Sequence, residues 1–292
     1  MEAESVTLAR PRHAATFTPR EAAERLLTHV LLIAYTAVAL VPIVLIIANS
    51  FKTRRAIFSA PFALPTSETF SLIGYQTVFA RSNFEVYYQN SLIVTVASLA
   101  LVLFFGAMAA HALAEYRLPG GNLMFLYLVL GIMIPIRLGT VSLLRFITDL
   151  GLTNTLLALI LVYTAMGLPV AIFILRQMME HVPRELKDAA RIDGASEYRI
   201  FWLVLPLIRP AIGTVAVFSM LPIFNDLWFP LILAPSESTK TVTLGAQAFL
   251  GQFVTDWNAV LAALTLAMIP VFALYLLFSR QLLGGLTAGS VK

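Results

Sequence analysis

The chain has 292 residues, of which 59% are hydrophobic and 12% are charged, and its formal net charge is +4. Soluble domains carry about 25% charged residues, so this composition excludes a soluble globular protein and indicates a protein of the lipid bilayer. The absence of cysteine excludes disulfides, thiol catalysis and cysteine-ligated zinc sites.

Six apolar runs predict six transmembrane helices, because a helix needs about 20 apolar residues to cross a bilayer. The first run lacks a convincing small-residue cleavage site after it and is expected to be retained as a span. We therefore predict an all-α integral membrane protein with a single membrane domain over residues 26–282. The predicted spans are residues 26–50, 90–114, 123–144, 156–178, 203–233 and 257–282.

The distribution of basic residues predicts the orientation of the chain. An even number of spans places both termini on one side of the membrane. With the amino terminus in the cytoplasm, thirteen of the twenty Lys and Arg residues lie on the inner side. Cytoplasmic loops are enriched in Lys and Arg, so residues 1–25 and 283–292 are predicted to be cytoplasmic tails. The longest outer segment, residues 51–89, is expected to contain a short helix at 73–79.

The densest cluster of charge lies in residues 183–210, between predicted spans four and five. The pattern predicts two short helices. Pro183 suits a first helical position, and Gly194 interrupts because glycine readily adopts positive φ. Ser196 is a candidate N-cap for the second helix. An aromatic stripe at helical spacing follows and consists of Tyr198, Phe201, Trp202 and Leu205. From the pattern alone, a solvated loop between two spans is an equally good interpretation.

This stretch resembles the EAA loop in the membrane subunits of binding-protein-dependent ABC importers. The family pattern is Glu-Ala-Ala, three residues, Gly, and then about nine residues before an Ile-x-Leu-Pro ending. This chain departs from it in two ways: Asp188 replaces the Glu, and the spacing after Gly194 is one residue shorter. The matching residues are Asp188-Ala189-Ala190, Gly194 and Leu203-Val204-Leu205-Pro206.

Three further stretches resemble the carbohydrate-uptake branch of that family, and in particular its maltose-type second permease. Residues 191–196 read Arg-Ile-Asp-Gly-Ala-Ser, and the tail at 284–292 is glycine-rich. The turn at 114–121 resembles the Ala-Tyr-Ala and Phe-Pro-Gly turn of the family. His111 stands where a tyrosine is common, and we expect it to be a neutral histidine near the membrane interface.

The resemblance implies a permease subunit of an ABC importer in the bacterial inner membrane, which translocates a sugar or sugar-like solute. Its partners would be a second homologous permease, two ATPase subunits and an extracytoplasmic solute-binding protein. In the family, the loop matched here by residues 183–202 forms the coupling helix that docks into a cleft of the ATPase. The resemblance assigns coupling to Glu185, Asp188, Ala189, Ala190, Asp193, Gly194 and Ala195.

The sequence contains no phosphate-binding loop of the Gly-x-x-x-x-Gly-Lys-Ser/Thr type, so ATP and Mg²⁺ are expected on the partner ATPases. It also contains no His-Glu-x-x-His motif and no Gly-x-Ser-x-Gly motif. We therefore expect no catalytic residue, no metal site and no cofactor on this chain, which acts as a transport subunit and not as an enzyme.

Polar residues within two predicted spans are candidates for a substrate cavity, because polar groups at membrane depth are costly unless they face protein or water. Arg137 can donate paired hydrogen bonds to a hydroxyl-rich or anionic solute, or it can extend to the outer headgroups together with Arg145. Asn225, Asp226 and Trp228 offer an amide, a carboxylate and an indole, which suit sugar hydroxyls and a sugar ring. The same three side chains can instead hydrogen-bond helices to one another.

Three alternatives remain open. An ABC permease for an anionic polyol, or for a sulfonated or phosphorylated sugar derivative, is favoured by Arg137 and Arg145. An ion-coupled secondary transporter would need paired intramembrane carboxylates or an inverted repeat, and only Asp226 lies well inside a predicted span. A membrane enzyme would need a catalytic constellation, and a structural scaffold would not need an ATPase. The EAA-like loop argues against both.

Overall fold

The computed structural model describes residues 19–116, 118–250 and 255–288. Within these ranges the regular structure is helical, and the β-structure is limited to one isolated bridge between Lys52 and Phe70. The predicted all-α fold is therefore confirmed for the described residues. Most of the predicted amino-terminal tail, residues 1–18, lies outside them.

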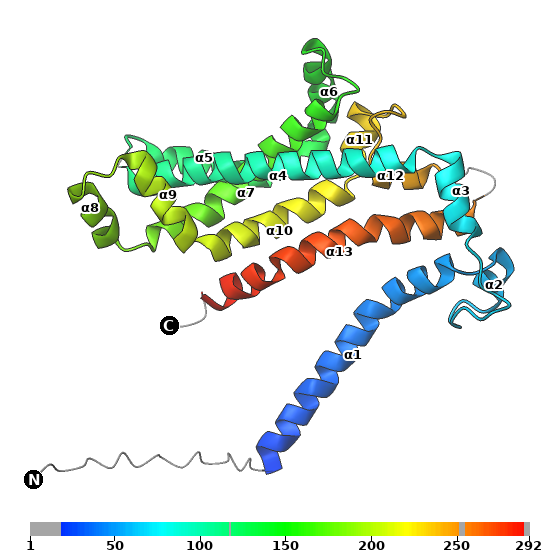
Figure 1. Cartoon of the computed structure of the whole chain (residues 1–292). Helices are drawn as coiled ribbons and strands as arrows, with labels where there is room; N and C mark the ends of the chain where they lie inside the picture. The colour runs from blue at the N-terminus through cyan, green and yellow to red at the C-terminus, as the bar shows by residue number, and fades with distance from the viewer. Residues whose placement is uncertain (1–18, 117, 251–254, 289–292) are drawn as a thin grey trace, which may run out of the picture.

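Five long helices form the body of the molecule (Figure 1). They are α1 (Pro19–Ser50), α4 (Phe84–Glu115), α7 (Leu156–Glu180), α10 (Arg209–Asn225) and α13 (Trp257–Ala288). Shorter helices connect them: α2 (Arg54–Ser59), α3 (Ile73–Arg81), α5 (Gly121–Met133), η1 (Ile136–Gly139), α6 (Thr140–Asp149), α8 (Arg184–Ile192), α9 (Glu197–Leu207), α11 (Trp228–Leu233) and α12 (Val242–Gln247). The predicted short helix at 73–79 is confirmed as α3.

By length and composition, three described helices can cross a membrane: Ala23–Ser50, Phe84–Glu115 and Leu156–Glu180. Two bent pairs of helices, α5 with η1 and α6, and α9 with α10, raise this number to five if each pair counts as one span. The described apolar part of α13, Trp257–Ala273, is shorter. The chain is thus a multi-pass membrane protein by its helices.

The third predicted span, residues 123–144, is not one helix. α5 ends before Ile134, whose backbone is extended, and η1 and α6 continue at an angle of 81°. Pro135 explains the break, because proline donates no backbone hydrogen bond and disfavours a helical conformation in the residue before it. Arg137 and Arg145 consequently lie in different helical segments.

The fifth predicted span, residues 203–233, is divided twice. α9 and α10 meet at 76° around Ile208, and α10 ends at Asn225. Asp226 then adopts an extended conformation before α11 begins. Asp226 therefore lies at a helix break and not inside a helix, and the break leaves backbone N–H groups that need partners. At the other end of the chain, α13 remains helical through Ala288.

Small residues bring α4 and α7 into close contact along the centre of the bundle. A Cβ atom on Gly106 would lie 2.9 Å from the Cβ of Ala171, and one on Gly167 would lie 2.6 Å from a methyl group of Val102. Lipid tails are as apolar as the helix surfaces, so no hydrophobic effect drives membrane helices together. Close approach at small residues allows the van der Waals packing that holds such helices against each other. α10 packs beside this pair, and α13 beside α10 (Figure 1).

The bundle has two distinct ends. The α8 end consists of α8, α9 and the turn after α4, and the α12 end consists of α2, α3, α11, α12 and their loops (Figure 1). At the α12 end, Asn90 donates hydrogen bonds of 2.9 Å to the carbonyls of Ser238 and Lys240. α1 meets the other helices at this end and diverges from them, and none of its most apolar 18-residue window is buried.

Candidate functional site

The EAA-like stretch forms the two predicted helices, α8 and α9, and the turn between them explains its small residues. Gly194 has φ of 78°, and a Cβ there would meet nothing within 4 Å. The backbone conformation, and not lack of space, therefore requires glycine. The N–H of Ala195 donates to the carbonyl of Ala190 at 2.9 Å, and that of Gly194 to Arg191 at 3.0 Å, which is the Schellman pattern of a helix end.

Two details of the predicted unit are wrong. Pro183 lies just before α8 with ψ of 133°, so it is not the first helical residue. Ser196 occupies the N-cap position of α9, but its side chain makes no capping hydrogen bond.

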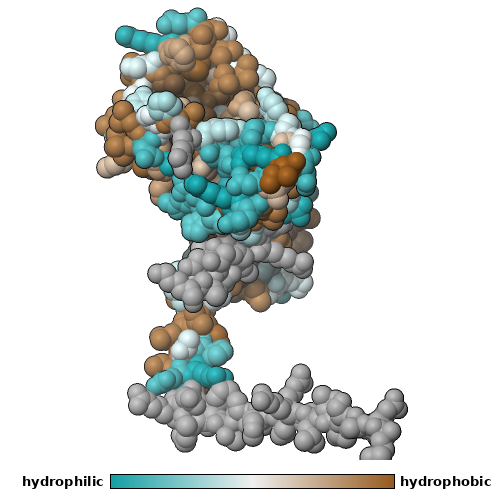
Figure 2. All heavy atoms as spheres, turned by 90° about the vertical axis from the view of Figure 1, so that its left-hand side faces the viewer, coloured by the Kyte–Doolittle hydropathy of each residue, from teal (hydrophilic) through white to brown (hydrophobic). Residues whose placement is uncertain are grey.

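The seven residues predicted for coupling divide into two groups. Ala190 and Ala195 pack against the hydrophobic core at the α8 end and, with Gly194 and Asp193, build the turn. The side chains of Glu185, Asp188 and Ala189 are exposed and form a free surface. Exposed apolar residues outside this set of seven lie on the same two helices, namely Leu186 and Ile192 of α8 and Tyr198 of α9. Figure 2 looks onto this end and shows hydrophilic residues gathered beside apolar ones.

A cluster of charges joins α8 to the end of α4. Glu115 accepts hydrogen bonds from Lys187 Nζ and from Arg191 Nη2, each at 2.6 Å. Arg191 also donates to Asp188 at 2.8 Å and to Glu197 at 3.0 Å. Contact with Glu197, and then with Glu115 and Asp188, raises the pKa of Arg191, so its charge is permanent. We call Glu115, Lys187 and Arg191 the α4–α8 clamp.

From the sequence, Lys187 and Arg191 fall within the loop at 183–202, but their pairing with Glu115 is not predicted. One signal was available: Lys187 and Arg191 are four residues apart, so they share a helix face, and Glu115 ends an apolar run. Only the fold shows that this carboxylate lies opposite the two cations, because the contact spans 72 residues of chain.

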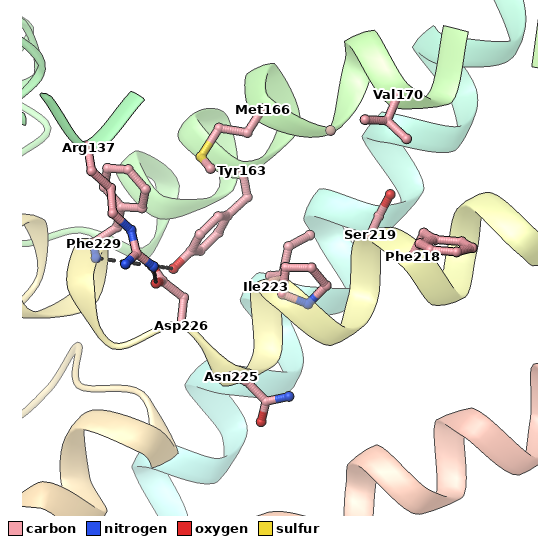
Figure 3. Close-up of a pocket in the computed structure, with 12 residues that line it drawn as sticks. Arg137, Tyr163, Met166, Val170, Phe218, Ser219, Ile223, Asn225, Asp226 and Phe229 are labelled. Carbon is pink, nitrogen blue, oxygen red and sulfur yellow. Dashed lines mark hydrogen bonds and ion pairs between the residues drawn. The ribbon is translucent and has the colours of Figure 1, made fainter. Parts of the chain in front are cut away.

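A cavity of about 490 Å³ lies between η1, α7, α10 and α11 (Figure 3). Most of its lining is apolar or aromatic, and four polar residues open onto it besides the hydroxyl of Tyr163. The polar residues are Arg137, Ser219, Asn225 and Asp226, and the larger apolar ones are Met166, Val170, Phe218, Ile223 and Phe229. Cavities of this size and lining are typical of small-molecule sites.

Asp226 is the most engaged polar group of this cavity. Its carboxylate accepts a hydrogen bond from the Tyr163 hydroxyl at 2.9 Å and from the backbone N–H groups of Trp228 and Phe229, at 3.3 and 3.1 Å. It therefore satisfies donors at the start of α11 that the helix break leaves free. The Arg137 guanidinium lies 3.6 Å from the same carboxylate. We call Arg137, Tyr163 and Asp226 the cavity junction; they point toward one another in Figure 3.

The other predicted cavity residues are placed differently. Asn225 points away from Asp226 (Figure 3), donates to the carbonyl of Leu221 at 3.0 Å, and also borders a second cavity of about 270 Å³ toward α13. Trp228 is outside the lining of the first cavity, and its indole donates to Thr140 at 3.0 Å. The structure therefore brings Arg137, Asn225 and Asp226 to the cavity and uses Trp228 to fasten α11 to α6.

His111 lies in α4 near the α8 end and is 7% exposed. Its Nε2 has no hydrogen-bond partner among the described residues, and its ring contacts the ring of Phe201 at 5.4 Å between centroids. A charged imidazolium buried here would leave a donor without an acceptor, which favours the neutral ring that the sequence predicts.

Comparison with known proteins places the chain in a family. The family described as binding-protein-dependent transport system inner membrane component matches residues 102–285. The diacetylchitobiose uptake system permease protein NgcG of Streptomyces coelicolor is 34% identical, over 91% of this chain and 88% of that protein. The probable starch degradation products transport system permease protein AmyC of Thermoanaerobacterium thermosulfurigenes is 31% identical, over 86% and 91%.

The arabinooligosaccharides transport system permease protein AraQ of Halalkalibacterium halodurans is also 31% identical, over 87% of this chain and 92% of that one. Among solved structures, a bacterial ABC transporter involved in the import of the acidic polysaccharide alginate has the same fold. Its matching chain has a TM-score of 0.76 at 21% identity, with 90% of this chain and 98% of that chain covered. This chain therefore belongs to the family of inner membrane components of binding-protein-dependent transport systems.

Proposed function

We propose that this chain is the permease subunit of an ATP-driven importer for neutral di- or oligosaccharides. The observation that carries the saccharide assignment is the agreement among its relatives, whose names specify diacetylchitobiose, starch degradation products and arabinooligosaccharides. Family membership also removes the support for an ion-coupled secondary transporter, since the family works with a binding protein.

The cavity favours a neutral solute over an acidic one. Among its lining residues, Arg137 and Asp226 are the charged ones, and they have opposite charge and lie 3.6 Å apart. An acidic solute that bound Arg137 would compete with a carboxylate that is only 9% exposed. Sugars need hydroxyl partners and flat apolar faces, which Ser219 and the exposed ring of Phe218 offer.

An acidic saccharide derivative is the second candidate. The side chain of Arg137 is 69% exposed, so a guanidinium is free on one side for a carboxylate, sulfonate or phosphate group. Uptake of a neutral saccharide and of its uronic-acid counterpart, measured on the same complex, separates the two candidates.

The proposed topology has six spans and both termini in the cytoplasm. The spans are α1, α4, the bent segment from α5 to α6, α7, the broken segment from α9 to α11, and α13. The cytoplasmic tails are residues 1–25 and the end of the chain, and the permease domain is residues 26–282. Support comes from the basic residues of α8 and α9 and from the first turn of α1 and the last turn of α13, which lie toward the α8 end (Figure 1).

The proposed complex contains a second homologous permease, two ATPase subunits and an extracytoplasmic binding protein. ATP and Mg²⁺ bind to the ATPases, and this chain holds no cofactor. The loop at 183–202 transmits closure of the ATPase dimer to the spans. Its exposed Glu185, Asp188 and Ala189 contact the ATPase, while Ala190, Asp193, Gly194 and Ala195 fix the angle between α8 and α9.

The first test is mass spectrometry of the proteins that co-purify with this chain after gentle solubilisation of native membranes. We expect an ATPase with a phosphate-binding loop and a second permease. The saccharide bound to the cognate binding protein then identifies the solute, and uptake of that saccharide must be lost when the gene for this chain is deleted. Recovery of the chain alone across several mild detergents contradicts the proposal.

A further inference from the structure

α4 differs from the other long helices in having no proline. The described helices of 17 or more residues other than α4 each contain one internal proline, namely Pro42, Pro169, Pro222 and Pro270. A proline removes one helical hydrogen bond and allows the helix to bend. α4 runs for 32 residues without such a break, which is about 48 Å at 1.5 Å per residue. Among these long described helices, α4 is the one that connects the two ends of the bundle without an internal proline.

At the α12 end, α4 is fastened to the loop that follows α11. The amide of Asn90 binds two carbonyls of this loop, and the hydroxyl of Ser91 accepts the backbone N–H of Val242 at 2.8 Å. The hydroxyl of Tyr87 donates to Glu237 in the same loop. Four hydrogen bonds from three residues on one face of the first turns thus hold residues 237–242 against α4.

At the α8 end, the clamp is the main attachment of α8. Lys187 is the one buried residue among the nine of α8, and its ammonium group binds Glu115 at 2.6 Å. The side chains of Lys187 and Glu115 are 6% and 10% exposed. Removing one member of a buried pair leaves an uncompensated charge, so such a contact stays closed as the elements around it move. α8 is therefore attached to α4 by an ion pair and to α9 by the turn at Gly194.

We propose that Glu115 is a positioning residue that makes α8 and α4 move as one body, so that α4 carries displacement between the loop at 237–242 and the ATPase-facing surface of α8. This inference rests on the proposed function of α8 in coupling. It predicts that, without the Glu115 carboxylate, movement of the loop at 237–242 no longer moves α8. The cavity and the exposed face of α8 are unaltered by this change.

A distance measurement tests the attachment without any partner subunit. The chain has no cysteine, so Ile192→Cys on α8 and Phe105→Cys on α4 can carry two spin labels without other changes. Both positions are exposed. With Glu115 present, we expect one narrow distance distribution for the chain in lipid nanodiscs. We expect Glu115→Gln to broaden it, and an unchanged narrow distribution overturns the proposal.

A coupling measurement tests the consequence in the reconstituted complex. The readout is the stimulation of ATP hydrolysis by saccharide-loaded binding protein. We expect Glu115→Gln to lower this stimulation about fivefold or more, within the usual range of coupling between two sites. Wild-type stimulation in this variant overturns the proposal. The matched control is Glu180→Gln, which removes a 2.8 Å ion pair with Arg176 inside α7 and leaves α8 attached.

A conservative variant separates positioning from mere stability. Glu115→Asp keeps a carboxylate opposite both Lys187 and Arg191, and we expect it to retain most of the stimulation. If Glu115→Gln does not accumulate in the membrane, Glu115→Gln with Lys187→Met removes both charges and leaves no buried ammonium. We expect this double variant to lose the stimulation of ATP hydrolysis as well, and wild-type stimulation in it overturns the proposal. Absence of saccharide uptake by the wild-type complex contradicts the proposed function instead, and the distance measurement remains decisive for the clamp.

Discussion

The two charged clusters of this permease each pair a carboxylate with a cation, and they differ in how firmly that pair is held. In the α4–α8 clamp, both cations lie 2.6 Å from Glu115, and Lys187 is buried. In the cavity junction, Arg137 is 69% exposed and lies 3.6 Å from Asp226. Removing one partner of a buried pair costs about 3–5 kcal/mol, whereas exposed pairs contribute about 0–1 kcal/mol. The clamp is therefore a permanent attachment, and the contact of Arg137 with Asp226 is one that solute can open.

The difference has a local cause. Asp226 is satisfied by the Tyr163 hydroxyl and by two backbone N–H groups of α11, so it keeps its place when Arg137 moves. Glu115 is held by the two cations of α8, and these cations depend on it in turn. This arrangement suits the proposed function, in which the cavity changes between states while α8 follows α4.

The largest expected effect is on the clamp. Glu115→Ala leaves Lys187 buried without its carboxylate, and we expect a loss of about 3–5 kcal/mol in stability. The measurement is thermal unfolding in detergent, followed by fluorescence-detected size exclusion. Glu180→Ala, which removes an i,i+4 pair within α7 whose carboxylate is 45% exposed, should change stability by no more than about 0.5 kcal/mol. Equal effects of the two variants would show that the clamp is as weak as a surface pair.

The next effect is on the fixed part of the cavity junction. Tyr163→Phe removes the hydroxyl that donates to Asp226 at 2.9 Å. We expect a loss of about 1.5–3 kcal/mol, because the acceptor is charged. The same thermal measurement applies. A loss of stability as small as that of Arg137→Ala would mean that Tyr163 does not hold the Asp226 carboxylate. The contacts of Tyr163 and of Arg137 with Asp226 would then be equally weak.

A third effect concerns the turn of the coupling unit. Gly194→Val forces a side chain into a left-handed conformation, which costs about 1–2 kcal/mol, while leaving every contact of the clamp in place. We expect the protein to insert into the membrane but to lose ATP-dependent uptake. Gly194→Asn is the matched control, since asparagine tolerates this conformation. Normal uptake by the valine variant would count against a coupling role for this turn.

The smallest expected effect on stability is that of Arg137→Ala, about 0–1 kcal/mol, because the guanidinium is largely exposed. Its effect on transport is specific: the cavity gains net negative charge, so we expect uptake of an acidic saccharide to fall more than that of a neutral one. The measurement is competition between the two solutes in proteoliposomes. Unchanged uptake of both would remove Arg137 from the solute path.

Local patterns were sufficient for the coupling unit. The two helices, the positive φ of Gly194 and the small residues around it follow from interactions within a few residues, so the sequence alone predicts them. The cavity was predicted less well. Arg137, Asn225 and Asp226 do line it, but Tyr163 and Ser219 were not selected, because a tyrosine or serine in an apolar run carries no local signal of what it faces.

The sequence by itself determined that this protein is helical, lies in the membrane and forms two short helices around the turn at Gly194, because hydropathy and turn chemistry act over one helix or one turn. The tertiary structure decided where spans break and which charges meet. Glu115 and Lys187 are 72 residues apart in the chain, and Tyr163 and Asp226 are 63 apart. Such pairs depend on how whole helices pack, and small residues such as Gly106 and Gly167 set that packing through the closest approach of α4 and α7.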